Sequence, residues 1–200
     1  MKNISDQDTR FRELAFIEII NFLKKNNIHF FVWGGALLGF RREKNFIKWD
    51  WDVEIGFYQD ELTNNWSKIV SFMKKNNFNI LQENKMDLKI EVNKYTSENI
   101  TKFSLVGWIF DIFTQNYIRN KINIPKKFLK NMELIKFKND YFNCPGPVDE
   151  FLTHMYGDWQ TPKKTKNKSE YLNQKFLNQN YWRFYKRYER LKLIFGLKFK

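Results

Sequence analysis

One stretch, FVWGGALLGFRREKNFIKWDWDVEIGF (residues 31–57), limits the folds open to this chain more than any other. An aromatic and branched run leads into a glycine pair, and the stretch closes where acidic and apolar residues alternate. Alternation with a period of two indicates a strand, whose successive side chains point to opposite faces. Asp50, Asp52 and Glu54 are therefore predicted to lie on one face of a strand over residues 49–57.

These three acids need a positive partner. Carboxylates crowded on one face repel one another, and burial raises their pKa. A hard divalent cation fits best, because Mg²⁺ typically binds one or two protein carboxylates together with substrate phosphates. A further acid, Asp111, lies within the apolar run WIFDIFT and needs a partner as well. The alternative is a set of exposed acids at a sheet edge, paired with Lys or Arg, which the apolar neighbours of these acids disfavour.

The glycine pair adds a second side to this predicted site. Gly34 and Gly35 follow a predicted strand over residues 29–33 and precede a short predicted helix, ALLGFRREK. Backbone N–H groups at such a turn can approach an anion, helped by the helix dipole. A glycine pair alone more often marks a tight turn. Followed 17 residues later by an Asp-x-Glu strand, it predicts phosphate on one side of a metal site and carboxylates on the other.

The rest of the chain changes between helical and strand periodicity. Helices are predicted over residues 8–26, 61–76 and 147–157, and candidate strands run between residues 78 and 115. A loop-rich region punctuated by prolines separates these strands from the third helix. The order predicts an α+β (or α/β) domain with a mixed β-sheet flanked by helices. A C-terminal basic amphipathic helix is predicted over roughly residues 170–194.

Length and composition narrow the class of protein. A chain of 200 residues can bury a real core, and its apolar runs stop well before the ~20 residues of a membrane span. The N-terminus has no apolar segment typical of a signal peptide. A single cysteine, Cys144, cannot form an internal disulfide. Together these features favour a reducing, cytoplasmic location.

The positive charge is concentrated near the C-terminus. Residues 163–200 carry 12 Lys and Arg against 2 Glu, whereas residues 1–162 are nearly neutral within a total of +13. We therefore expect a domain over residues 1–162, followed by a basic linker and an amphipathic helix. That helix could pack on the domain, lie on an anionic membrane at the inner face, or bind nucleic acid. Packing is favoured, membrane contact is compatible with it, and nucleic acid is disfavoured.

The motifs around the glycines and acids resemble those of the LicD and fukutin family, within the nucleotidyltransferase (polymerase-β-like) superfamily. That family carries a stretch close to GGTLLGxxRxxxFIxWDDDIDI, and this chain has GGALLGFRREKNFIKWDWDVEI in register, with Arg42 at the family arginine. FDIF around Asp111 resembles the second acidic strand of the family, and EFLTHMYGDWQTP resembles its closing motif. The resemblance covers roughly residues 28–57, 107–114 and 145–162. It implies a nucleotidyltransferase-like fold.

Three positions depart from the family pattern. Trp51 replaces the middle acid of the family's triple, and by alternation it faces away from the metal pair, into the core. Glu54 stands where the family usually has Asp, which the wider superfamily accepts. Ala36 replaces a common threonine and removes a hydroxyl contact.

The resemblance implies transfer of a phospho-alcohol from a CDP-activated donor to a sugar hydroxyl, with release of CMP. The acceptor expected is a surface glycan, lipid-linked in some cases, in bacterial capsule, lipopolysaccharide or teichoic acid. By this resemblance Asp52, Glu54 and Asp111 are catalytic and hold one or two Mg²⁺ or Mn²⁺ ions, and Asp111 accepts the proton of the acceptor hydroxyl. The implied substrate-binding residues are Gly34, Gly35, Arg42, Asp50, Tyr156, Asp158 and Trp159.

Individual roles follow for several of these residues. The glycines would present N–H groups to phosphate, and Arg42 would pair with a phosphate oxygen. Asp50 would orient a ligand or a water molecule, and Trp159 would stack on a base or a sugar. For Tyr156, Asp158 and Trp159 the alternative is a packed helix end at Gly157.

Two other functions stay open at the level of sequence. The same metal site would serve a nucleotidyltransferase that moves NMP from an NTP and releases pyrophosphate. A non-catalytic module that binds nucleic acid or membrane would instead bind salt-sensitively and would not depend on Asp52. The sequence does not distinguish phosphocholine, phosphoethanolamine, glycerol phosphate and ribitol phosphate as the transferred group.

Overall fold

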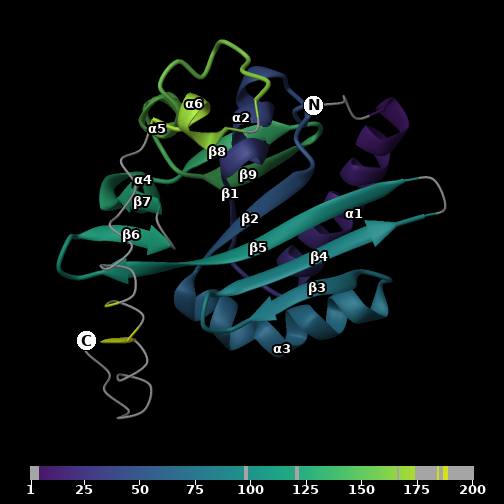
Figure 1. Cartoon of the computed structure of the whole chain (residues 1–200). Coiled ribbons are helices and arrows are strands. Elements are labelled where there is room, and N and C mark those ends of the chain that lie inside the picture. The colour runs from purple at the N-terminus through teal and green to yellow at the C-terminus, as the bar shows by residue number, and fades with distance from the viewer. Residues whose placement is uncertain are drawn as a thin grey trace.

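The computed structural model describes residues 5–96, 99–119, 122–165 and 167–173, together with residues 184, 187 and 188 (Figure 1). Most of the predicted C-terminal helix lies outside these residues. The described part of that region includes the short helix α6 (Lys168–Tyr171).

The longer helices begin and end close to their predicted positions. The first begins at Asp6 because the Ser5 side chain accepts a hydrogen bond from the Asp8 N–H (3.0 Å), and Lys24 and Lys25 suit its negative C-terminal end. The helices preceding α6 are α1 (Asp6–Lys25), α2 (Gly34–Arg42), α3 (Gln59–Lys75), α4 (Lys126–Lys130) and α5 (Val148–Tyr156). None of the described helices is both long and apolar enough to cross a membrane.

The described strands differ from the predicted ones: those expected over residues 29–33 and 49–57 are shorter, and additional strands form in the region predicted to be rich in loops. The described strands are β1 (Phe31–Val32), β2 (Asp52–Tyr58), β3 (Asn79–Asn84), β4 (Lys89–Tyr95), β5 (Ile100–Asp111), β6 (Asn116–Arg119), β7 (Ile122–Pro125), β8 (Glu133–Phe137) and β9 (Asp140–Cys144). Two predicted strands fuse into the single long β5. The region predicted to be rich in loops contains the hairpins β6–β7 and β8–β9, because its prolines lie at the ends of strands: Pro125 closes β7, and Pro145 follows β9.

The described strands form a mixed seven-stranded sheet and a separate two-stranded one, β8–β9. The main path of the large sheet runs β1-β2-β5-β4-β3, and β6 continues from the far part of β5. β2 and β5 are parallel, while the other pairs of the described sheet are antiparallel. The predicted fold class, a mixed sheet flanked by helices, is confirmed.

One face of the sheet carries most of the core. Val53 and Ile55 on β2 and Phe103 on β5 are fully buried, and α1 and α3 both contact β5 on this side (Figure 1). The alternate residues of β2, Asp52 and Glu54, point to the opposite face. Figure 1 shows α2, α5, α6 and the β8–β9 hairpin gathered at the end of the sheet where β2 begins. The acids therefore lie at the end of the sheet where α2, α5, α6 and the β8–β9 hairpin gather.

Candidate active site

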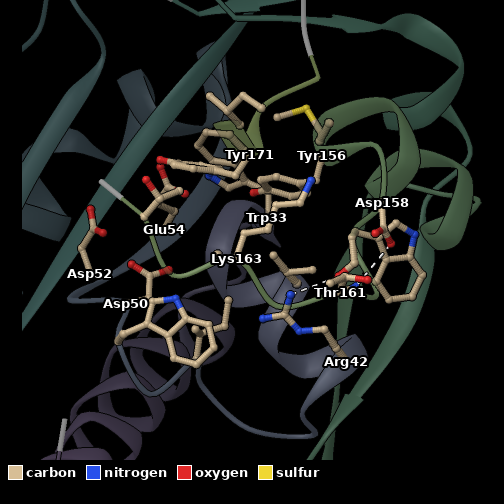
Figure 2. A pocket seen from close by; sticks show the side chains of 18 of the residues that line it. Trp33, Arg42, Asp50, Asp52, Glu54, Tyr156, Asp158, Thr161, Lys163 and Tyr171 are labelled. Atoms are coloured by element: carbon tan, nitrogen blue, oxygen red, sulfur yellow. Dashed lines mark hydrogen bonds between the residues drawn. The ribbon is translucent and has the colours of Figure 1, made fainter. Parts of the chain in front are cut away.

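The predicted acids gather at the start of β2. Asp52 and Glu54 are the first and third residues of the strand, on the face opposite the buried Val53. Asp50 lies in the turn before the strand, where its N–H donates to the Ile47 carbonyl oxygen (3.2 Å). Figure 2 shows the three acidic side chains on one side of a pocket.

The prediction that Trp51 faces the core is wrong. Its side chain is 45% exposed. The strand begins only at Asp52, so the alternation of faces does not reach the residue before it. The tryptophan that replaces the middle acid of the family pattern is therefore a solvent-facing residue beside the site.

The glycine pair makes room for the acids. Gly34 and Gly35 are the first two residues of α2, and Gly34 has a φ of +61°, which favours glycine. A Cβ atom at Gly34 would lie 1.8 Å from Glu54 Oε2, and one at Gly35 would lie 1.9 Å from Asp50 Oδ2. The backbone N–H of Gly35 donates to the Glu54 carboxylate. The positive end of α2 therefore meets protein carboxylates, and contact of the glycines with phosphate stays a prediction.

Burial and mutual repulsion disturb the ionisation of two of the acids. Burial, and next the charge of Asp52, raises the pKa of Glu54 to about 7. The same two causes, in the same order, raise the pKa of Asp50 to about 7. At neutral pH both carboxyls are thus close to the balance between protonated and charged forms, and a nearby cation would favour the charged form.

Two arginines that no sequence motif singled out flank the acids. Arg12 on α1 is 2% exposed and is attracted by the charges of Asp50 and Asp52. Arg119 on β6 is attracted first by Glu54. Burial lowers the pKa of both guanidinium groups, and among the described residues neither Nε atom has a hydrogen-bond partner. Both arginines are far from the acids in the chain, so no local motif reveals them.

Asp111 is not brought to the other acids. β2 and β5 are parallel, and Glu54 lies opposite Ser104. Asp111 is seven residues beyond Ser104, which is about 23 Å along the strand at roughly 3.3 Å per residue. Its carboxylate accepts hydrogen bonds from the Phe113 N–H (3.0 Å) and the Thr114 hydroxyl (2.6 Å), closing the turn after β5. The predicted metal and proton-accepting roles of Asp111 do not fit this position, because the residue lies at the wrong end of the neighbouring strand.

The acids form one wall of a pocket of about 250 Å³. Figure 2 shows Arg42 and Asp158 across this pocket from the acids. The predicted substrate-binding residues that line it are Gly35, Arg42, Asp50, Tyr156, Asp158 and Trp159. Gly34 is not among the lining residues, but it lies directly against the side chain of Glu54, which is part of this wall. The structure thus brings every predicted site residue except Asp111 to one place.

Arg42 holds two walls of the pocket together. Its Nη1 donates to the Trp159 carbonyl oxygen (3.0 Å), and its Nη2 donates to Glu43 (2.7 Å). Its Nε atom is buried without a partner among the described residues. To pair with phosphate as predicted, Arg42 would use this Nε–H group and keep its hydrogen bonds to Trp159 and Glu43.

Unpartnered N–H groups recur around the pocket. Trp33 and Trp159 both line it and are 2% and 7% exposed, and within the described chain the indole N–H of each lacks an acceptor. Buried donors are normally satisfied, so a cluster of open ones indicates a ligand rich in acceptors. Burial, and then Glu54 and Asp50, raises the pKa of Tyr156 well above its ordinary value, so its hydroxyl remains a donor at neutral pH.

The pocket is closed by a segment whose first residues were predicted to belong to the domain and whose remainder was predicted to be a basic linker and the start of the C-terminal helix. This closing segment, residues 158–165 and 167–173, contributes Thr161, Lys163 and Tyr171 to the lining. Burial, followed by Asp50 and Glu54, raises the pKa of Tyr171, which places its hydroxyl near the acids. The polar, lysine-rich composition of this segment is typical of a solvated loop and hides its role.

The carboxylates of the pocket suit a hard divalent cation that is bound together with a substrate. Among the described residues, no group of three or more His, Cys, Asp or Glu side chains is arranged to hold a metal by itself. Asp52 and Glu54 supply two adjacent carboxylates, and burial, followed by repulsion from Asp52, raises the pKa of Glu54 to about 7. Mg²⁺ commonly uses one or two carboxylates and completes its shell with water and phosphate. The residues therefore fit such an ion, with Asp52 and Glu54 as its protein ligands.

The metal-free protein is expected to lose stability as the pH rises from about 5 to 8. The folded state raises the pKa of Glu54 from 4.5 to about 7, so it binds this proton more tightly than the unfolded chain does. The resulting stabilisation is complete below pH 4.5 and is lost as the pH rises through 7. In a chelator, the midpoint of thermal unfolding should be lower at pH 8 than at pH 6 by about 4 °C or more. Mn²⁺ should restore it at pH 8; a higher midpoint at pH 8 in chelator would contradict this account.

Comparison with known families places these residues in context. A family model described as LicD/FKTN/FKRP, nucleotidyltransferase domain, matches residues 27–147. The matched region contains the glycine pair, the three acids and Arg42, and it ends before the closing segment. No curated protein matches the chain.

A likeness is also found among solved structures. The antibiotic-resistance factor ANT(2'')-Ia, known from a solution structure, is similar to this chain with a TM-score of 0.47 and 13% sequence identity. The similarity covers 69% of this chain and 66% of that protein.

Proposed function

Because the chain belongs to the LicD/FKTN/FKRP nucleotidyltransferase-domain family, we propose that it is a metal-dependent transferase acting on a CDP-activated alcohol. It would move the phospho-alcohol to a sugar hydroxyl of a surface glycan and release CMP. Membership of the family confirms the predicted resemblance and supports a phosphotransferase or nucleotidyltransferase-like activity. The observation that supports transfer from a CDP-alcohol is one pocket with crowded acids on one wall and, among the described residues, N–H donors of Arg42, Trp33 and Trp159 that lack a partner.

Both kinds of wall suit the diphosphate of a nucleotide diphosphate donor. The diphosphate is rich in acceptors and negative charge, and it would lie between the acids with their cation and the N–H groups of Arg42, Trp33 and Trp159. When bound at Asp52 and Glu54, a divalent cation would neutralise the diphosphate and stabilise the departing CMP. The enclosed pocket would also exclude bulk water from the reacting phosphorus.

Asp50 is the best-placed acceptor for the proton of the attacking hydroxyl. The hydroxyl oxygen would form a bond to the phosphorus that carries the alcohol, the bond from that phosphorus to the CMP oxygen would break, and the proton would pass to Asp50. A general base works best with a pKa near the working pH, and burial raises the pKa of Asp50 to about 7. This assignment replaces Asp111, which lies at the far end of β5.

Calorimetric titration tests the proposal. CDP-choline, CDP-ethanolamine, CDP-glycerol, CDP-ribitol, CTP and ATP would each be titrated with and without Mn²⁺ into the full chain and into the variant Asp52→Asn. We expect one CDP-alcohol to bind only with Mn²⁺ and to lose at least about tenfold in affinity in the variant, which corresponds to ~1.4 kcal/mol. Incubation of that donor should then release CMP.

Two outcomes would point elsewhere. Tight, metal-dependent binding of CTP or ATP alone, with pyrophosphate as the released product, would replace the proposal with nucleotidyl transfer from an NTP. Binding of every nucleotide to the same degree with and without Mn²⁺, and with Asp52 intact or changed, would remove the metal site from the mechanism.

A further inference from the structure

The closing segment is tied to the body of the protein at both ends. Near its start, the Trp159 carbonyl oxygen accepts a hydrogen bond from Arg42 Nη1 (3.0 Å). At its end, the Asn173 N–H donates to the Met155 carbonyl oxygen on α5 (2.8 Å). The segment therefore leaves α5 and returns to it, forming an arch beside the pocket, whereas a linker would lead away from the domain.

The arch carries one lysine to the pocket. Lys163 lines it together with Thr161 and Thr165. Figure 2 shows Lys163 between the acids on one side and Arg42 on the other. Lys163 therefore brings an exposed, positively charged side chain to the edge of the pocket, between the carboxylates and Arg42.

Among the described residues, Lys163 differs from Arg42 and Lys164 in having no partner. The Arg42 end groups bond Trp159 and Glu43, and the Lys164 ammonium lies over the Trp49 ring at 5.9 Å from its centroid. Among the described residues, Lys163 makes no ion pair or hydrogen bond. An ammonium group held at a pocket wall without a carboxylate is available to an anionic ligand at no cost in broken contacts.

We propose that Lys163 binds the diphosphate of the donor, an inference that rests on the proposed function. A cation at Asp52 and Glu54 would engage one side of the diphosphate, leaving phosphate oxygens that face the arch. Lysine binds phosphate as a point charge, and the arch keeps its ammonium on that side of the pocket. The tail predicted to begin at residue 163 thus supplies a substrate-binding residue of the domain.

Two neighbouring lysines make a matched experiment. CDP and inorganic pyrophosphate, each with Mn²⁺, would be titrated at fixed ionic strength into the full chain and into Lys163→Ala, Lys163→Arg and Lys164→Ala. Lys163→Ala should weaken both ligands about tenfold, the equivalent of ~1.4 kcal/mol. Lys164→Ala removes the same charge one residue away and should change affinity by less than about twofold, because Lys164 does not line the pocket and its ammonium lies over the Trp49 ring. Lys163→Arg should recover most of the binding.

Each alternative outcome has a distinct meaning. Equal losses in the two alanine variants would show a diffuse effect of charge and overturn the proposal, as would an unchanged Lys163→Ala. If the unaltered chain binds manganese pyrophosphate but not CDP, the proposed cytidine donor is wrong. The affinities of the Lys163 and Lys164 variants for pyrophosphate then decide the proposal for Lys163. If it binds neither ligand, the pocket is not a diphosphate site and both proposals fall.

Discussion

Replacing Glu54 with glutamine is expected to lower transfer by about a thousandfold or more, equivalent to ~4 kcal/mol of transition-state stabilisation. The substitution keeps the size of the side chain and the oxygen that accepts the Gly35 N–H, but it removes a carboxylate from the pair that would hold the metal. The same change should make the metal-free protein more stable at pH 8. Burial of the Glu54 charge is unfavourable, as its pKa of about 7 shows, and a neutral amide avoids that cost.

Activity and stability therefore move in opposite directions in this one variant. Transfer rates measured with saturating Mn²⁺ would be set against thermal unfolding in chelator at pH 8. Glu150→Gln is a suitable control. Glu150 on α5 is exposed and pairs with Lys127, so its replacement should change neither quantity appreciably. A Glu54→Gln protein that keeps a tenth of the activity, or that unfolds earlier than the original in chelator, would show that Glu54 is not a buried metal ligand.

Replacing Gly34 with alanine is expected to destabilise the protein by about 3–5 kcal/mol, through backbone strain and overpacking together. The new Cβ would lie 1.8 Å from Glu54 Oε2 and 2.9 Å from Glu54 Cδ, so the carboxylate must move. The backbone at this position also has φ +61°, which an L-residue adopts with strain. Denaturant unfolding measures the loss, and transfer activity should fall with it because Glu54 is displaced.

Gly157 offers a matched control for the strain alone. Its φ is +65°, and its nearest neighbour to an added Cβ is 3.6 Å away. Its ψ of −115° lies outside the left-handed helical region, so Gly157→Ala should cost only the strain of a sparsely populated backbone conformation, about 1–3 kcal/mol. When Gly34→Ala is added to Glu54→Ala, the colliding carboxylate is already gone. The added loss of stability should then be nearly the same as that of Gly157→Ala. Equal losses for the two single glycine variants would show that contact with Glu54 does not explain the glycine at position 34.

The parts of the site that could be predicted share a local origin. The glycine pair, the acids and Arg42 lie within one short stretch, where strand alternation and helix start signals limit the geometry. Even there, the partner of the glycine N–H groups did not follow from the motif: the Gly35 N–H is directed at the Glu54 carboxylate, and contact of the glycines with phosphate stays a prediction. The types of these residues indicated a site, but the partner of each residue depends on contacts between segments of the chain.

The parts that could not be predicted depend on register and on long-range contacts. Asp111 lies on the strand next to β2, as the order of strands suggests, but the pairing of Glu54 with Ser104 leaves it at the other end. Arg12 and Arg119 approach the acids from α1 and β6, and a buried arginine looks like any other arginine in a sequence. The hairpins β6–β7 and β8–β9 were missed because their prolines, which lie at strand ends, resemble loop signals.

The separation between the acids and the arch has a consequence for how such an enzyme could diversify. Residues 50–54 lie inside the region that the family model matches, whereas residues 158–173 lie beyond it. The acidic wall of the pocket and the arch are thus encoded in different stretches of the gene. Because the arch is attached to the body mainly at its two ends, its interior residues can be exchanged with little effect on the sheet. Selection could then retune which alcohol is accepted while leaving the phosphoryl chemistry intact.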